Sequence, residues 1–304
     1  MIPYLQTKFQ AYNKVFALIL MMALGVMLPQ LHALSFLIQY LLMFMLFYAF
    51  WGIEIKSDFF HKGLIWLLLT NLAVAFVSYW ILYRLNMTLA LAAFVTGIAP
   101  TAIASPVVVS FINGHVPYVI GSVLLTNIVS ALVVPFALPY IVGTVVEISI
   151  LQVLQPVLIV MFVPLILTRL AILLPQNVRG VIGKGKAMSF PAWLVNLLII
   201  SAKAAEFLRS EAVNSTSMVI SIAFISLVIC VVNFSLGALL GGRRYWQESS
   251  QALGQKNNSF VIWIALTFIN PLVAMGPTFY ILYHNLYNSW QIYRFQKQQK
   301  DRGL

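Results

Sequence analysis

The chain has 304 residues, of which 62% are hydrophobic and 8% are charged, and it carries a net charge of +11. No stretch is long enough and polar enough to form a separate soluble domain, so composition predicts an all-α, polytopic membrane protein. Its basic residues cluster in short segments between apolar spans, as membrane orientation signals do, and on that ground we exclude nucleic acid as a partner. A single cysteine, Cys230, excludes a disulfide framework.

Ten membrane-spanning helices are predicted from windows of about 17 to 25 mainly apolar residues. They lie near residues 14–30, 34–51, 64–83, 88–112, 117–142, 151–174, 190–208, 216–240, 247–270 and 272–293. The first apolar run follows two lysines, but no small-residue cleavage site comes after it, so we expect it to be retained as the first helix.

The distribution of basic residues predicts that both termini are cytoplasmic. With that orientation the inner segments hold thirteen lysines and arginines, whereas the outer connections hold only Arg84 and Arg209. The thirteen are Lys8, Lys14, Lys56, Lys62, Arg179, Lys184, Lys186, Arg243, Arg244, Arg294, Lys297, Lys300 and Arg302. A miscount by one span early in the chain would destroy this bias, which therefore supports the ten spans. We expect the protein in a plasma membrane, of the bacterial inner-membrane kind.

The two halves of the chain resemble each other. The stretch Ser110–Asn113 (Ser-Phe-Ile-Asn) is echoed by Thr267–Asn270 (Thr-Phe-Ile-Asn), and Gly121 and Asn127 are echoed in the same way by Gly276 and Asn285. Because five spans, an odd number, make up each unit, the units 1–143 and 144–304 are expected to have opposite orientations. Inverted repeats of this kind are a common architecture of secondary transporters.

Span four contains Pro100 and Pro106, with the hydroxyl residues Thr101 and Ser105 between them. Each proline removes a backbone donor and clashes with the preceding turn, so we expect the helix to bend or unwind here. An ordinary proline kink would explain this span by itself. However, the equivalent span nine is interrupted as well, by the polar stretch Gly254–Ser259. Two interrupted helices in corresponding positions of two repeats indicate a transporter's binding site.

Lys256 lies at the centre of this polar stretch. At about 1.5 Å per residue from Arg244, it is about 18 Å into the bilayer, near the middle. An ionisable group at that depth costs at least about 2.5 kcal/mol on insertion scales, which indicates a functional site facing a cavity or the bundle interior. The alternative is a span that starts later, so that Lys256 only reaches the membrane surface.

Other polar residues in the spans give weaker signals. Asn71 in span three is explained by an interhelical hydrogen bond, and Lys203 with Glu206 by a solvated helix end. We find no pairing of nucleophile and base, no phosphate-binding glycine loop and no metal-ligand spacing. The sequence therefore predicts neither an enzyme nor a bound cofactor.

Four stretches resemble one family in chain order over nearly the whole length. They are Gly52–Phe59, Thr101–Ser105, Gly254–Ser259 and Tyr283–Asn285, and together they resemble the bile acid:sodium symporter family. The resemblance implies a panel domain of spans 1–2 and 6–7, and a core domain of spans 3–5 and 8–10. It also implies that spans four and nine cross at the centre of the core, that sodium binds at the crossing, and that organic anions bind in the adjacent cavity.

The chain departs from that family at the positions that bind sodium. A serine and an asparagine of the family become Ser105 and Pro106, and two positions that supply hydroxyls become Val119 and Val123. The family's glutamate aligns with Ala252, its glutamine in the same stretch with Lys256, and its glutamine in span three with Asn71. Sodium requires several oxygen ligands, and an ammonium in the same place repels it, so sodium is doubtful as a coupling ion.

These observations predict a secondary transporter for a small organic anion, working by alternating access. Lys256 could act as a permanent substitute for sodium, as a titrating proton carrier, or as a direct partner of a substrate carboxylate. The alternatives are a sodium-dependent symporter with a rebuilt ion site, a non-transporting receptor or sensor, and a channel. No oligomer is required. The candidate substrate- and ion-binding residues are Asn71, Thr101, Ser105, Pro106, Gln255, Lys256, Asn257, Asn258, His284 and Asn285.

Overall fold

A computed structural model describes residues 16–51, 61–142, 149–210 and 216–301. These residues are helical almost throughout, and the one isolated bridge recorded among them joins Thr101 to Lys256. The elements in chain order are the helix Phe16–Met27, η1 (Pro29–Phe36), α2 (Leu37–Trp51), α3 (Gly63–Tyr83), α4 (Met87–Ile98), α5 (Ser105–Phe111), α6 (Val116–Val142), α7 (Ile150–Ile172), α8 (Gln176–Lys184), η3 (Gly185–Met188), α9 (Ser189–Ser210), α10 (Thr216–Gly254), α11 (Asn258–Phe268) and α12 (Pro271–Asp301).

Six helical stretches of the described residues are long and apolar enough to cross a membrane. They are Pro29–Trp51, Gly63–Tyr83, Val116–Val142, Ile150–Ile172, Gln176–Ser210 and Thr216–Gly254. The predicted class, an all-α, multi-pass membrane protein, is therefore confirmed. The total of ten spans stays a prediction, because 88–112 and 247–270 are divided into shorter helices and residues 1–15 lie outside the described part.

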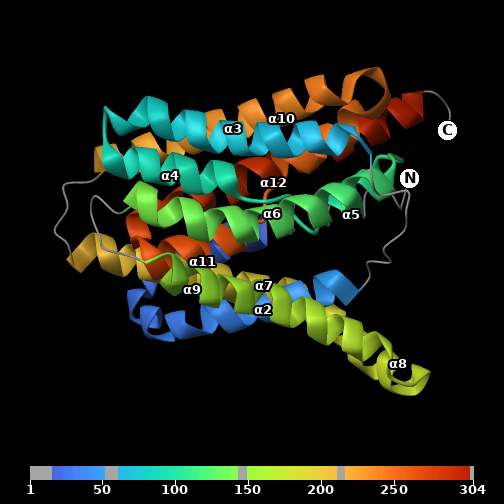
Figure 1. The fold of residues 1–304 in the computed structure, drawn as a ribbon, viewed down its shortest axis with the longest axis horizontal. Coiled ribbons are helices and arrows are strands. Elements are labelled where there is room, and N and C mark those ends of the chain that lie inside the picture. Colours follow the sequence, from blue (N-terminus) through green and yellow to red (C-terminus); the bar gives the residue numbers. More distant parts are fainter. Residues whose placement is uncertain (1–15, 52–60, 143–148, 211–215, 302–304) are drawn as a thin grey trace.

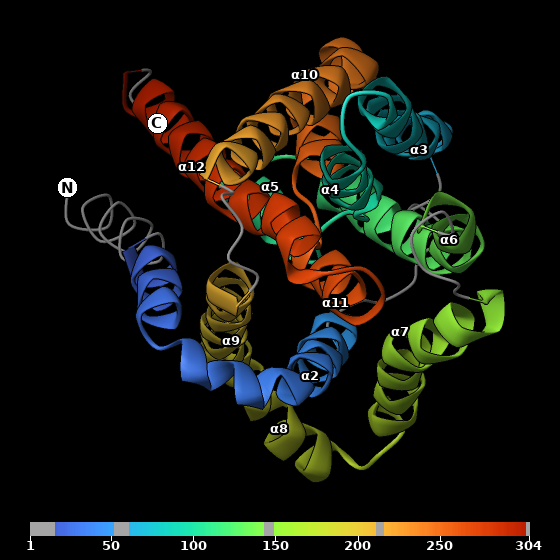
Figure 2. The same cartoon turned by 90° about the vertical axis from the view of Figure 1, so that its left-hand side faces the viewer.

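The helices form two groups (Figures 1 and 2). In Figure 2 α2, α7 and α9 lie on one side, and α3, α4, α10 and α12 lie on the other. Within the groups α2 packs against α7 and α9, α3 packs against α4, and α10 packs against α12. The groups meet where α6 packs on α7 and where α12 packs on α9.

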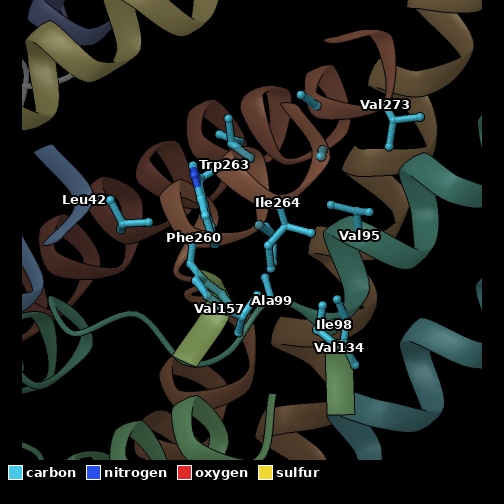
Figure 3. Packing of buried hydrophobic residues seen from close by; sticks show 14 of the residues in the cluster. Leu42, Val95, Ile98, Ala99, Val134, Val157, Phe260, Trp263, Ile264 and Val273 are labelled. Carbon is cyan, nitrogen blue, oxygen red and sulfur yellow. The ribbon is translucent and has the colours of Figure 1, made fainter. Parts of the chain in front are cut away.

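A buried apolar cluster joins the two groups, with α11 at its centre. Figure 3 shows Phe260, Trp263 and Ile264 of α11 between Leu42 of α2 and Val95 of α4. Each of these side chains is at most 4% exposed. α11 is therefore held on several sides by packing, which fixes the position of the polar residues that precede it.

α10 consists of two helical pieces that fold back on each other. Gly242 has a φ of 57° and Tyr245 also leaves the helical region, so the chain turns there. Glycine adopts this left-handed φ without steric cost. A Cβ built on Gly237 would stand 2.8 Å from the Cα of Ser250, so the two pieces touch backbone to backbone. The turn lies between the predicted spans eight and nine, where Arg243 and Arg244 were expected in a connection.

Close packing between α3 and α4 depends on Gly97. A Cβ at this residue would lie 2.8 Å from the Cα of Ala75, a separation that requires the two backbones to move apart. We expect Gly97→Ala to cost about 1–3 kcal/mol, as overpacking of a close contact does. Thermal unfolding of the purified protein measures this cost. Gly180→Ala is the matched control, because nothing lies within 4 Å of a Cβ at Gly180. Equal midpoints for the two variants would contradict the close contact.

Candidate functional site

The first interruption lies between α4 and α5. α4 ends at Ile98, and α5 begins at Ser105 with Pro106 in its first turn. Ala99 is extended (φ −52°, ψ 129°), as the residue before a proline usually is. The predicted interruption is confirmed, but it begins and ends earlier than Thr101–Pro106. The correction concerns Ser105 and Pro106, because a proline in the first turn of a helix starts it rather than breaks it.

The second interruption lies between α10, which ends at Gly254, and α11, which begins at Asn258. It lies within the predicted polar stretch Gly254–Ser259 but is shorter, because Gly254 ends α10, and Asn258 and Ser259 begin α11. Gly254 is pressed against Phe234, since a Cβ there would overlap the aromatic ring. Only a glycine therefore fits at this last position of α10.

The two interruptions cross each other as a short antiparallel pair. Ala102 N donates to Gln255 O at 2.8 Å, and Asn257 N donates to Pro100 O at 2.7 Å. These bonds flank the bridge between Thr101 and Lys256. Unpaired backbone groups at membrane depth are tolerated only when protein or a water-lined cavity satisfies them. Here each interruption supplies hydrogen-bond partners for the other.

Lys256 reaches from the crossing to the end of α4. The residue is 2% exposed, and its Nζ donates to Asn71 Oδ1 and to Gly97 O, the latter at 3.2 Å. The Ile98 carbonyl accepts from Ser130 Oγ at 3.2 Å and from Asn71 Nδ2 at 3.5 Å. The last carbonyls of a helix lack partners within the helix and carry partial negative charge, so a cation is favoured there. Lys256 thus caps the C-terminus of α4.

Hydroxyl groups cap the other half-helix that ends at the crossing. Thr101 Oγ1 donates to Ala252 O at 2.6 Å and Ser105 Oγ donates to Gln251 O at 3.0 Å. Tyr280 Oη donates to Gly254 O at 2.7 Å. One helix end is therefore capped by the amino group of Lys256 and the other by three neutral hydroxyls.

Polar side chains along α6 form hydrogen bonds with Thr101 at the crossing. Thr126 Oγ1 accepts from Thr101 N at 2.9 Å, Asn127 Nδ2 donates to Thr101 O at 2.9 Å, and Ser122 Oγ lies 3.0 Å from Thr101 Oγ1. Sequence analysis missed Ser122, Thr126, Ser130 and Tyr280 as parts of the site. The spacing of the three α6 hydroxyl residues, four and eight apart, puts them on one helix face and was the available signal.

A cavity of about 430 Å³ lies beside the crossing, between the two groups of helices. One wall is polar and is formed by the crossing and α12; its predicted members are Gln255, Lys256, Asn257, Asn258, His284 and Asn285. The facing wall is largely apolar and includes Leu42 and Leu46 of α2 and Trp193 of α9. The other candidates, Asn71, Thr101, Ser105 and Pro106, do not line the cavity. Sequence analysis missed Asn288, Ser289 and Ser189, which do.

Several polar atoms in the cavity wall have no hydrogen-bond partner within the described part of the chain. They include Gln255 Oε1, Asn258 Oδ1 and Asn288 Nδ2, each on a residue that is at most 5% exposed. Asn258 Nδ2 lies 3.4 Å from Nδ1 of His284. A buried polar atom without a partner is costly, so these atoms are suited to a bound polar molecule or water.

The residues at the crossing do not fit a sodium ion bound as the resemblance implies. Ala252 packs in an apolar cluster with Leu64, Leu67, Val119 and Leu253, and Val123 is fully buried. These positions offer methyl groups where a hard cation needs oxygen. At the other ion position, the ammonium of Lys256 is bound to Asn71. Among the described residues no cluster of three His, Cys, Asp or Glu side chains could hold a metal ion.

The stretch Gly52–Phe59, one of the four that carry the family resemblance, lies outside the described residues, as do both ends of the chain. In comparisons with known proteins the chain matches no protein-family model and no curated protein. The family therefore stays an expectation based on the short sequence motifs.

Proposed function

We propose that this chain is a secondary transporter for small organic anions that works by alternating access and is not coupled to sodium. In this proposal it has ten spans in two inverted five-helix repeats, with the helix group of α2, α7 and α9 as a panel and the group around α10 and α12 as a core. The observation that carries the proposal is the crossing of two interrupted helices beside a buried cavity, which is the usual construction of a transporter's binding site.

The cavity supports a substrate with an anionic end and an apolar body. α11 begins at Asn258, in the polar wall, and the first backbone N–H groups of a helix favour an anion. The wall from α2 and α9 offers apolar surface to the rest of the molecule. The described lining residues include no carboxylate, so nothing among them repels an anion.

Of the three roles considered for Lys256, the geometry supports the fixed substitute for sodium. Lys256 lines the cavity, but its Nζ donates to Asn71 and Gly97, neither of which does, so its hydrogen bonds go to the protein rather than to a substrate. It supplies one positive charge at the end of α4, where a cation is electrostatically favoured. A charge attached to the chain needs no ion from solution, so the driving force would come from substrate exchange or from the substrate gradient itself.

We expect that replacing sodium with choline, at constant ionic strength, changes ligand affinity and uptake by less than about tenfold, or 1.4 kcal/mol. The physical reason is the missing carboxylate at Ala252 and the buried methyl groups at Val119 and Val123. A thermal-shift screen of organic anions, in sodium and in choline, identifies ligands because binding raises the apparent stability of the folded state. Uptake into vesicles then tests transport.

A loss greater than tenfold in choline would show that backbone carbonyls and water rebuild an ion site. Ligand binding without any flux across the vesicle membrane would contradict transport and favour a receptor on the same fold.

A further inference from the structure

α8 is an amphipathic helix that the rest of the described chain covers only in part. None of its nine residues, Gln176–Lys184, is buried. In Figure 1 it projects beyond the other helices at the end of the molecule where α12 also ends. At about 1.5 Å per residue a helix of this length is far too short to cross a bilayer. It was not predicted from the sequence, where this segment is only a basic connection.

Its apolar residues lie on one side. At about 100° per residue, Val181, Val178 and Ile182 fall within an arc of about 100°, which we call the apolar arc. Arg179 and Lys184 flank the arc, each about 60° beyond its edge. Val181 is 69% exposed and Val178 is 38% exposed. An apolar stripe with cations on both margins is typical of a helix that lies in a membrane surface.

Gly183 shows which side of α8 faces the protein. A Cβ on Gly183 would stand 3.5 Å from Nε1 of Trp51, which belongs to α2, so this side is the one in contact with the bundle. The chain stays beside α2 in η3, where a Cβ on Gly185 would overlap the hydroxyl of Tyr48. Gly183 is about 160° from Val181 around the helix, and the apolar arc therefore faces away from α2.

The surroundings of α8 point to lipid as the partner of the arc. At the end of α7, Leu170 is 57% exposed and Leu173 is 80% exposed, and α8 begins only three residues after Leu173. Exposed leucines on a membrane-spanning helix face lipid, so α8 starts at the depth of the lipid headgroups. The chain has no acidic residue from 148 to 205, whereas Arg179, Lys184 and Lys186 all lie in or next to α8.

We propose that α8 lies in the adjacent membrane leaflet, with Val178, Val181 and Ile182 among the upper acyl chains and with Arg179, Lys184 and Lys186 bound to acidic lipid headgroups. This docking attaches the α7–α9 connection, and through it α2, to the leaflet. It does not depend on the proposed transport function, since no residue of α8 lines the cavity.

The test uses the full-length chain with Cys230→Ala and one new cysteine, either Val181→Cys or Gly180→Cys, labelled with a fluorophore. Gly180 is the matched control, because it lies on the opposite face and is open to solvent. In vesicles that contain phosphatidylglycerol, we expect a quencher on the acyl chains to act at least about twofold more on position 181 than on position 180. Iodide in solution should show the reverse order.

A triple variant tests the role of the basic residues; it combines Arg179→Gln, Lys184→Gln and Lys186→Gln. In this variant, acyl-chain quenching of the label at position 181 should be the same in vesicles of phosphatidylglycerol and of phosphatidylcholine. Equal lipid quenching at 180 and 181 would overturn the proposal. So would a label at 181 that neither quencher reaches, because the arc would then be covered by protein. A triple variant that keeps the full difference would overturn the assignment of the basic residues to acidic lipid.

Discussion

Lys256→Met is expected to reduce ligand affinity and uptake at least tenfold, even though the Nζ of Lys256 is bound to Asn71 and Gly97, which do not line the cavity. The substitution removes the amino group that caps the end of α4 and leaves Asn71 Oδ1 and Gly97 O buried without that donor. Each such group costs about 1–3 kcal/mol. Gln255 and Asn257 belong both to the crossing and to the cavity wall. A less rigid crossing therefore lowers the affinity for the ligand. Equilibrium binding and thermal unfolding measure the two effects.

The pattern of loss distinguishes the roles of Lys256. A helix cap predicts similar losses for neutral and anionic ligands, whereas a direct substrate partner predicts losses for anions alone. Lys256→Arg should recover little, because a planar guanidinium is larger and the site is fully enclosed. Lys203→Met, at a partly buried position near the end of α9, is the matched control and should keep wild-type affinity. Unchanged affinity and stability in Lys256→Met would refute any functional role of the charge.

Sequence reasoning located this residue but not its partners. Hydropathy and the distance from Arg244 put Lys256 at membrane depth, and local chemistry at Pro100 and Gly254 predicted both interruptions, because these are properties of adjacent residues. The bond to Asn71, 185 residues away, depends on how α3 packs beside α4. The sequence predicted an interhelical hydrogen bond for Asn71 but did not show that Lys256 is the partner. No local sequence pattern identifies a partner so far away along the chain.

Tyr280 as a site residue and α8 as a helix were not predicted, and each omission has a physical reason. In the sequence Tyr280 cannot be distinguished from the other large apolar residues of α12. Only the tertiary structure brings its hydroxyl to Gly254 O. α8 contains Gly180 and Gly183, which are poor helix formers, and it is short, so propensity favours a loop. Gly183 of α8 and Gly185, the first residue of η3, contact α2. The local sequence shows neither these contacts nor the hydrogen bond of Tyr280.

The converse change should create a sodium site. Ala252→Glu with Lys256→Gln introduces the two residue types that the family resemblance implies at these positions. The Thr101 hydroxyl already lies beside the Ala252 carbonyl, and the Ser122 hydroxyl lies beside that of Thr101. In choline, the new carboxylate would be buried among Leu64, Leu67 and Val119 without a counter-charge. Removing the partner of a buried charge costs about 3–5 kcal/mol, so we expect a large fall in the thermal midpoint.

Sodium should reverse that fall in the double variant and leave the wild-type protein unaffected. An ion that binds only the folded state, at a hundred times its dissociation constant, stabilises by about 2.7 kcal/mol. Ala252→Gln with Lys256→Gln is the matched control, because it has nearly the same size without the carboxylate, and it should not respond. Thermal unfolding in sodium, potassium and choline at equal ionic strength measures all three proteins. If the glutamate and glutamine variants respond equally to sodium, the carboxylate is not a ligand. If the folded glutamate variant unfolds at the same temperature in every salt, then these two substitutions do not create a sodium site at the crossing.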